Sequence, residues 1–295
     1  MTTSGPYYSL GLTRLRNEIV SLYKSGKNTP ELAILYNCRP QSINYQLHRA
    51  GIELRQEHRY YTINNSFFEN IDNEYKAYWF GFLLADGSIQ QHRIILGLSV
   101  KDKKHIQLFQ QHIKSNHPIK YRKTKNKGKI IGKVAIVDIG CLKLIEQLKQ
   151  LAWYEFKKGI SPIAFEKVPI ELRRHMIRGF FDGDGCITKN RTSTHMGFER
   201  KIKFCGSEDT MKWIISYLYN NQICKTINKK ISYNKRKTLC TVDWSGDPLS
   251  QRFYNLIYLN SLVYLKRKKI RFETSDWMTK KTGGKNKGDK GEKNV

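Results

Sequence analysis

The chain carries Trp79-Phe80-Gly81-Phe82-Leu83-Leu84-Ala85-Asp86-Gly87 and, 98 positions later, Ile177-Arg178-Gly179-Phe180-Phe181-Asp182-Gly183-Asp184-Gly185. Each stretch predicts a mainly apolar helix that ends in a small residue, an aspartate and a glycine. A soluble protein seldom ends two buried helices in carboxylates without using them as a pair. The repeat therefore predicts that the two helices pack side by side and bring Asp86 and Asp184 together.

Small residues occur inside both stretches at a spacing of four, which places each pair on one face of its helix. Side chains of this size let two helix backbones approach closely, whereas larger ones would keep them apart. The expected helix interface consists of Gly81, Ala85, Gly179 and Gly183.

Two carboxylates held side by side repel one another, and a divalent cation relieves that repulsion. Asp86 and Asp184 are accordingly the candidate catalytic and metal-binding residues, with Mg²⁺ or another divalent cation such as Mn²⁺ as the cofactor. Such an ion can activate water for an in-line attack on a phosphodiester. The alternative for each aspartate is an ordinary turn residue at a helix end. Asp182 has no counterpart in the first copy, where Leu84 stands, and we expect it to make a local hydrogen bond or an outer contact.

The charge balance is strongly basic, with 53 Lys and Arg against 25 Asp and Glu and a formal net charge of +28. The lysine-rich tail from Thr279 contributes only +4, so the basicity belongs mainly to the folded part of the chain. Such a surface attracts polyanions, of which nucleic acid is the usual one and an anionic membrane the competitor. No apolar run is long enough to span a bilayer, and the N-terminus lacks the pattern of a signal peptide.

The cysteines are scattered and do not cluster with the histidines, which argues against a zinc site or a disulfide framework. They are Cys38, Cys141, Cys186, Cys205, Cys224 and Cys240. We expect an intracellular, reducing compartment: bacterial or phage-infected cytoplasm, or an organelle.

The segment from Leu12 to Arg55 predicts three short helices, the second beginning at Thr29-Pro30-Glu31 and the third at Arg39-Pro40. This spacing resembles a helix-turn-helix unit, whose last helix lies in the major groove of DNA. The alternative is a three-helix packing unit without DNA contact. The residues expected to face outward and contact DNA are Gln41, Ser42, Asn44, Tyr45 and His48.

From Asn73 the chain predicts the same order of elements twice: the helix ending in the aspartate, a strand, a helix, a basic hairpin and a last helix. The hairpins are expected over 119–139 and 225–244, and the last helices over 142–154 and 253–264. An internal duplication with a pseudo-twofold axis and a mixed α/β composition is the economical explanation. The domains we predict are a helix-turn-helix domain (1–57), a connector (58–72), repeat 1 (73–165), repeat 2 (166–278) and a disordered basic tail (279–295).

The two hairpins mix basic and polar side chains at strand spacing, so that alternate side chains face one way. One such face is suited to following the major groove, with Arg and Asn reading bases and Lys holding phosphates. An ordinary solvated basic hairpin is the alternative. The candidate DNA-binding residues are Lys120, Arg122, Lys123, Asn228, Lys230, Asn234 and Arg236.

The paired motifs resemble those of the LAGLIDADG homing endonucleases, specifically single-chain members that carry both repeats, over roughly 75–272. The resemblance implies an α+β fold in which two pseudo-symmetric αββαββα repeats form a DNA-binding saddle. It also implies a basic catalytic residue after the last helix of each repeat, for which the best matches are Lys158 and Lys268.

The leading hypothesis is a monomeric, site-specific endodeoxyribonuclease that binds double-stranded DNA and no membrane. The resemblance implies that it cuts both strands, leaves short 3′ overhangs and promotes the mobility of its own intron or gene. Two alternatives stay open: a DNA-binding regulator on a retired nuclease scaffold, and an RNA-splicing maturase, for which RNA would be the partner.

Overall fold

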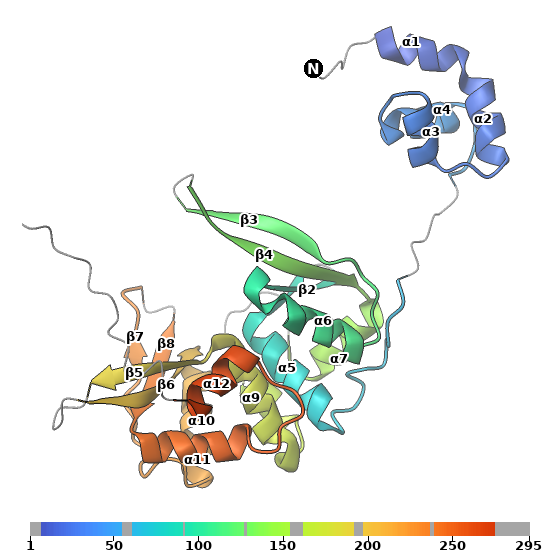
Figure 1. The fold of residues 1–295 in the computed structure, drawn as a ribbon. Coiled ribbons are helices and arrows are strands. Elements are labelled where there is room, and N and C mark those ends of the chain that lie inside the picture. The colour runs from blue at the N-terminus through green and yellow to red at the C-terminus, as the bar shows by residue number, and fades with distance from the viewer. Residues whose placement is uncertain are drawn as a thin grey trace, which may run out of the picture. The chain divides into compact units, whose positions relative to one another are not determined.

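The computed structural model describes residues 7–54, 61–90, 92–126, 129–153, 162–191, 197–236 and 239–274. Contacts divide the chain into two compact units, 1–60 and 61–295, which are drawn together in Figure 1. Each unit has a hydrophobic core of its own.

In the described part of the N-terminal unit, all regular secondary structure is α-helix. Asn28 caps the third helix: its side chain accepts a hydrogen bond from the Glu31 amide (2.8 Å), and the Glu31 carboxylate accepts one from the Asn28 amide (2.9 Å). The helix therefore begins at Thr29, with the cap one residue earlier than the Thr29-Pro30-Glu31 pattern indicated. The helices are α1 (Tyr7–Arg14), α2 (Arg16–Lys24), α3 (Thr29–Leu35) and α4 (Pro40–Arg49).

The second unit contains the predicted duplication, with the same elements in the same order in each half. The first half comprises α5 (Glu74–Asp86), β1 (Gly87–Gln90), β2 (Arg93–Ser99), the 3₁₀ turn η1 (Val100–Asp102), α6 (Lys103–His112), β3 (Lys120–Asn126), β4 (Lys129–Gly140) and α7 (Leu142–Gln150). The second half comprises α8 (Pro162–Glu166), η2 (Ile170–Leu172), α9 (Arg173–Asp184), β5 (Cys186–Arg191), β6 (Phe198–Gly206), α10 (Glu208–Asn220), β7 (Ser232–Tyr233), β8 (Cys240–Ser245), α11 (Asp247–Ile257) and α12 (Lys266–Glu273).

Each half forms one four-stranded antiparallel sheet, ordered β1-β2-β4-β3 in the first and β5-β6-β8-β7 in the second. The two sheets even keep an equivalent ion pair, Arg93–Asp138 at 2.5 Å and Lys201–Asp243 at 2.7 Å. The mixed α+β fold with two pseudo-symmetric halves is therefore confirmed.

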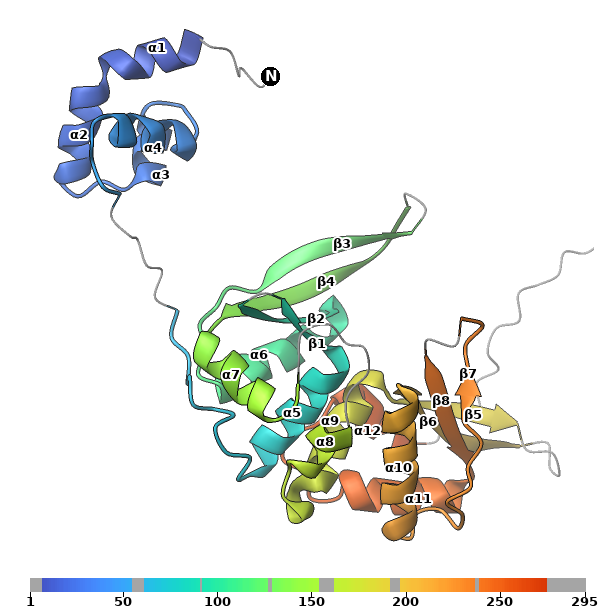
Figure 2. The same ribbon diagram turned by 180° about the vertical axis from the view of Figure 1, so that it is seen from behind.

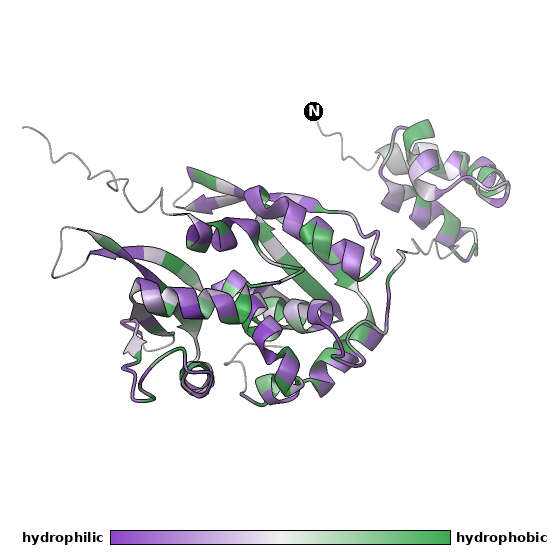
Figure 3. Cartoon of the chain, turned by 60° about the horizontal axis from the view of Figure 1, so that its bottom comes forward, coloured by the Kyte–Doolittle hydropathy of each residue, from purple (hydrophilic) through white to green (hydrophobic). Residues whose placement is uncertain are grey.

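One face of each sheet is buried, and along β8 this follows from the alternation of the buried Cys240, Val242 and Trp244 with the more polar Thr241 and Asp243. Along β4, Ala135, Val137 and Ile139 are buried, while the residues between them are partly open to solvent. Figure 3 shows this change of hydropathy along the strands, and Figures 1 and 2 show the helices packed against the sheets. Phe67 and Phe68 of the predicted connector belong to the same core.

Helices α5 and α9 pack against each other along their length, between the two sheets (Figure 2). A Cβ added to Gly81 would overlap the carbonyl oxygen of Met176, and one added to Gly179 would overlap that of Tyr78. A Cβ on Gly183 would collide with that of Ala85. The four residues of the expected interface thus lie where the helices approach most closely, and only residues this small permit that approach of the two backbones.

The predicted second hairpin is wrong over most of its first strand. Residues 225–231 form no strand, and β7 is only two residues long. Local bonds hold this segment in turns: the Asn228 amide donates to the Thr226 hydroxyl (3.1 Å) and the Lys229 amide to the Ile227 carbonyl (2.9 Å). Local side-chain bonds of this kind compete with a sheet ladder.

The predicted last helix over 253–264 is also wrong in its extent, since α11 ends at Ile257. The Ile257 carbonyl accepts a hydrogen bond from the Arg178 guanidinium (2.6 Å), and Asn260 has a φ of 56°. The chain thus leaves the helix to meet α9, and a separate helix, α12, begins at Lys266.

Candidate active site

The two motif aspartates end their helices at the same end of the α5–α9 pair. Asp86 is half-buried and Asp184 is exposed. The Asp86 carboxylate lies against Gly183, where an added Cβ would come within 3.4 Å of Oδ2. The helix packing therefore places both motif aspartates at one end of the helix pair.

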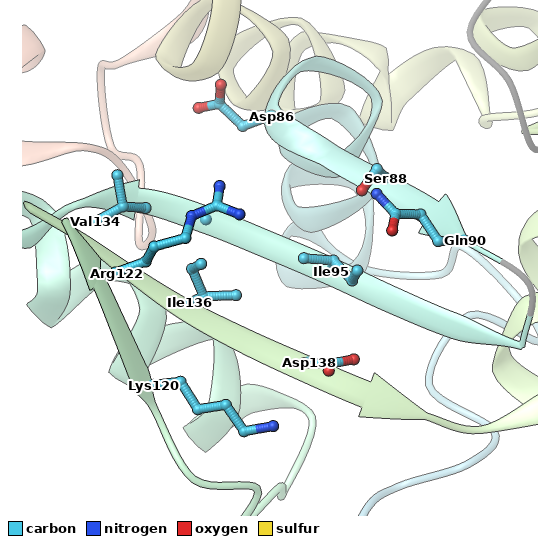
Figure 4. A pocket seen from close by; sticks show the side chains of 10 residues that line it. Asp86, Ser88, Gln90, Ile95, Lys120, Arg122, Val134, Ile136 and Asp138 are labelled. Atoms are coloured by element: carbon cyan, nitrogen blue, oxygen red, sulfur yellow. The ribbon is translucent and has the colours of Figure 1, made fainter. Parts of the chain in front are cut away.

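A pocket of about 530 Å³ opens beside Asp86 over the exposed face of the first sheet. Figure 4 shows the side chains of Asp86, Ser88, Gln90 and Arg122 around this space. The remaining lining residues are Ile95, Gly97, Lys120, Val134, Ile136 and Asp138. The carboxylate therefore shares one surface with basic, amide and apolar side chains.

Lys268 lies under the end of α9 and is nearly inaccessible to solvent. Its ammonium group donates hydrogen bonds to the carbonyl oxygens of Phe181 (2.6 Å), Gly183 (3.1 Å) and Gly185 (2.5 Å). These bonds neutralise helix-end carbonyls on both sides of Asp184. Burial lowers the pKa of Lys268 to about 8, although the negative charges of Asp182 and Asp86 act to raise it.

Asp182 is fully buried and satisfied by three donors, none of them local: all three come from segments far away in the sequence, so the expected local hydrogen bond is wrong. The hydroxyls of Tyr78 (2.8 Å) and Tyr258 (2.5 Å) and the amide of Leu265 (2.7 Å) all donate to its carboxylate. Burial raises the pKa of Asp182, while the charge of Lys268 opposes that rise. The carboxylate joins α5 of the first half to the chain that leads into α12.

Another buried group makes a second link between the halves. The Arg178 guanidinium donates to Glu74 at the start of α5 (2.6 Å) and to the carbonyl of Val263 (2.8 Å). The same Glu74 carboxylate accepts a hydrogen bond from the Leu262 amide (2.6 Å). These polar groups were not predicted as partners, because the segments that carry them lie far apart in sequence.

The predicted DNA-binding residues of the first hairpin divide between two faces of β3. Lys120 and Arg122 line the pocket beside Asp86. Lys123 follows Arg122 directly along the strand and therefore points to the opposite face. On that opposite face the ammonium of Lys133, which pairs with Lys123, lies over the Tyr121 ring at 4.7 Å.

The candidates of the second hairpin, Asn228, Lys230, Asn234 and Arg236, are all exposed, but none of them lies on a strand. In the N-terminal unit, Gln41, Tyr45 and His48 are exposed, and Ser42 and Asn44 are half-buried. Lys158 lies outside the described residues.

Sequence reasoning missed several residues of the pocket, namely Ser88, Gln90, Ile95, Gly97, Val134, Ile136 and Asp138. The available signal was the isolated glycine at position 97, which interrupts the apolar run 94–98 of a predicted strand.

No protein-family model matches the chain, and no curated protein matches it at a significant level. Solved structures do match. The homing endonuclease I-WcaI bound to its DNA recognition sequence is 15% identical, with a TM-score of 0.51 over 69% of this chain and 90% of that one. The LAGLIDADG meganuclease I-AabMI bound to uncleaved DNA is 11% identical, covering 68% and 88% with a TM-score of 0.44. The LAGLIDADG homing endonuclease I-GzeII in complex with its DNA target is 13% identical, covering 68% and 87% with a TM-score of 0.43.

The second unit has a LAGLIDADG-type fold. At these identities the likeness concerns the fold, and the roles of individual residues depend on the geometry described above. No helix in the described ranges is both long and apolar enough to span a membrane.

Proposed function

We propose that the chain is a monomeric, site-specific endodeoxyribonuclease that makes metal-dependent double-strand breaks. The observation that carries the proposal is the pair Asp86 and Asp184, held together by glycine-mediated helix packing. An exposed sheet face bearing basic side chains begins directly beside Asp86. The resemblance to homing endonucleases adds that the cut supports mobility of the element that encodes the protein.

Asp86 and Asp184 suit a magnesium ion, which binds proteins through one or two carboxylates and takes further ligands from water and substrate phosphates. Over the ranges that the structure describes, no cluster of three or more His, Cys, Asp or Glu side chains is placed to hold a metal. Two carboxylates and the phosphodiester would therefore share the ion. When bound, it would supply an activated water and stabilise the leaving 3′ oxygen.

Protein groups contribute to this chemistry by positioning. Lys268 holds the carbonyls around Asp184, and the Asp182 carboxylate fixes the Leu265 amide just before α12. Lys120 and Arg122 extend the positive surface away from Asp86, where they would contact phosphates. In the N-terminal unit, we propose that α4 adds contacts in the major groove through Gln41 and its outward neighbours.

Cleavage of a plasmid pool with randomised inserts, with magnesium and then with EDTA, tests the proposal. We expect magnesium-dependent double-strand breaks at one site, lost in Asp86→Asn and in Asp184→Asn. Asp72→Asn is the matched control, because Asp72 is exposed just before α5, at the other end of that helix. Specific DNA binding without cleavage under varied metals would favour the regulator, and binding of an intron transcript without DNA cleavage would favour the maturase.

A further inference from the structure

The exposed faces of the two sheets differ in chemistry although their strands correspond. In the first sheet, Gly87 lies opposite Leu96, and Ile95 lies opposite Asp138. In the second sheet, Cys186 lies opposite Lys203, and Lys203 lies opposite Asp243. Counting from the glycine that follows each motif aspartate, the equivalent pairs are Ile95 and Lys203, Gly97 and Cys205, and Ile136 and Thr241.

The second sheet therefore has polar side chains where the first has Ile95 and Ile136, and it has the side chain of Cys205 where the first has Gly97. Ile95 and Ile136 are half-buried and open on the pocket beside Asp86, and Figure 4 shows both side chains pointing into it. Their counterparts are the ammonium of Lys203 and the hydroxyl of Thr241. The duplication has therefore kept the strands and the ion pairs while changing what this surface can recognise.

Gly97 forms a notch between the apolar side chains of this surface. It lies directly opposite Ile136, and a Cβ added to it would lie 3.5 Å from Ile136 Cγ1 and 3.5 Å from Val134 Cγ1. That distance is ordinary van der Waals contact, so the missing Cβ leaves an open space with apolar walls, against which an incoming methyl group can pack.

In the major groove of DNA, the 5-methyl of thymine is the exposed methyl group that distinguishes its base pair from the others. Because the surface around the notch carries Lys120 and Arg122, it is suited to a polyanion. The one carboxylate besides Asp86 in the pocket, Asp138, is paired with Arg93.

We propose that the notch formed by Ile95, Gly97, Val134 and Ile136 reads a thymine methyl, so that the half of the target bound by the first repeat is recognised by apolar contact. This inference rests on the proposed function and specifies how one half of the site is read. The second repeat, with Lys203, Cys205 and Thr241 at the equivalent positions, reads its half by hydrogen bonds.

The test begins with a binding site selected from a random DNA pool by the full chain with EDTA present. Thymines in that site are then replaced by deoxyuridine, one half at a time, and dissociation constants are measured by fluorescence anisotropy. Deoxyuridine differs from thymidine only in lacking the 5-methyl group. Loss of one buried methyl should weaken binding about fourfold, and the loss should occur in one half of the site only.

Gly97→Ala supplies the decisive variant, because its new methyl fills the notch from the protein side without a close contact. We expect it to remove the difference between thymine and deoxyuridine in that half. Cys205→Ala, at the equivalent position in the second sheet, should weaken binding to the other half of the site and keep the wild-type difference between thymine and deoxyuridine in this half. Ile136→Thr, which copies Thr241, should reduce the preference by removing one apolar wall, and thermal unfolding of each variant checks its fold.

The inference is overturned if deoxyuridine has no effect in either half, if Gly97→Ala leaves the penalty unchanged, or if the selected half contains no thymine. A pool that yields no enriched sequence would contradict the proposed function together with the inference. Specific binding to a thymine-containing site with no methyl dependence would leave the proposed function in place and remove the inference alone.

Discussion

Lys268 is the residue that supports the chain on both sides of Asp184. Three backbone carbonyls accept its hydrogen bonds, and a charged donor at a helix C-terminus is favourable for those carbonyls. A methionine has a similar length and no donor, so Lys268→Met would leave the carbonyls without this partner. We expect a loss of about 2–4 kcal/mol in the free energy of unfolding, measured by urea denaturation, and a slower cleavage rate.

The control for this prediction is Lys266→Met, two residues earlier, where the lysine is exposed. It should change the free energy of unfolding by less than about 0.5 kcal/mol. Equal stability of the Lys268 and Lys266 variants would contradict the supporting role and leave Lys268 as a residue that acts on DNA directly.

His105 makes stability depend on pH in the acid range. Its ring is buried, with Nε2 2.8 Å from the hydroxyl of Tyr78, which donates to Asp182. Burial lowers the pKa of His105 from 6.5 to about 3. Between these values the unfolded chain binds a proton that the folded chain does not, so the free energy of unfolding decreases as the pH falls below 6.5.

At pH 4.5 this proton should cost the folded state about 2–3 kcal/mol relative to pH 7. His105→Gln, compared at both pH values by urea denaturation, should lose that part of the pH dependence, while His48→Gln, at an exposed position, should keep it. Burial also lowers the pKa of His175, to about 4, so some acid sensitivity should persist in both variants. An unchanged pH dependence in His105→Gln would refute the assignment.

At the scale of elements, the α5–α9 pair determines the geometry of the site. Gly179→Ala would place a methyl group on the carbonyl oxygen of Tyr78, a backbone atom that cannot move without its helix. We expect a loss of about 3 kcal/mol or more in the free energy of unfolding and loss of cleavage, since Asp86 and Asp184 would separate.

Gly140→Ala is the matched control for this substitution. An added Cβ there would meet only the mobile end of Arg93, at 3.6 Å, and the free energy of unfolding should stay within about 0.5 kcal/mol of the wild type. If Gly179→Ala unfolds at the wild-type denaturant concentration, the two helices are not held at the distance described.

The elements that the sequence predicted well were those determined by local pattern. Helices ending at Asp86 and Asp184 followed from apolar spacing and a terminal glycine, and the first hairpin followed from alternation. The strand expected at 225–231 failed because Thr226 and Asn228 form local turns. The end of α11 at Ile257 depends on Arg178, which lies 79 positions away, so no local pattern indicated it.

The candidate site was predictable to the same extent. Its two carboxylates and the small residues before them form a repeated motif that can be recognised from the sequence alone. The buried partners of Asp182, and the carbonyls bound by Lys268, meet only when the two halves pack. The notch at Gly97 depends on the register between β2 and β4, which the strand pattern alone left undetermined.

At the scale of the whole molecule, the chain joins two units, each with its own core. The N-terminal unit presents Gln41, Tyr45 and His48 on the exposed face of α4. A DNA contact by this unit would raise the effective concentration of the second unit at its site, so that affinity would increase without any change in the second unit. A protein consisting of residues 61–295 should therefore still cut its site, because both motif aspartates belong to the second unit.

Removal of residues 1–60 should weaken binding about 100-fold or more, as expected for loss of a linked binding unit. It should also make affinity less sensitive to salt, because fewer phosphates are contacted. Dissociation constants over a salt series, with EDTA present, measure both effects. The full chain carrying Gln41→Ala, Tyr45→Ala and His48→Ala should lose affinity in the same direction, since α4 would no longer contact the groove. Gln41 and His48 lie at the two ends of α4, so each single variant should account for part of the loss. Wild-type affinity and salt dependence for residues 61–295 would show that the N-terminal unit binds no DNA and that the second unit supplies the whole affinity.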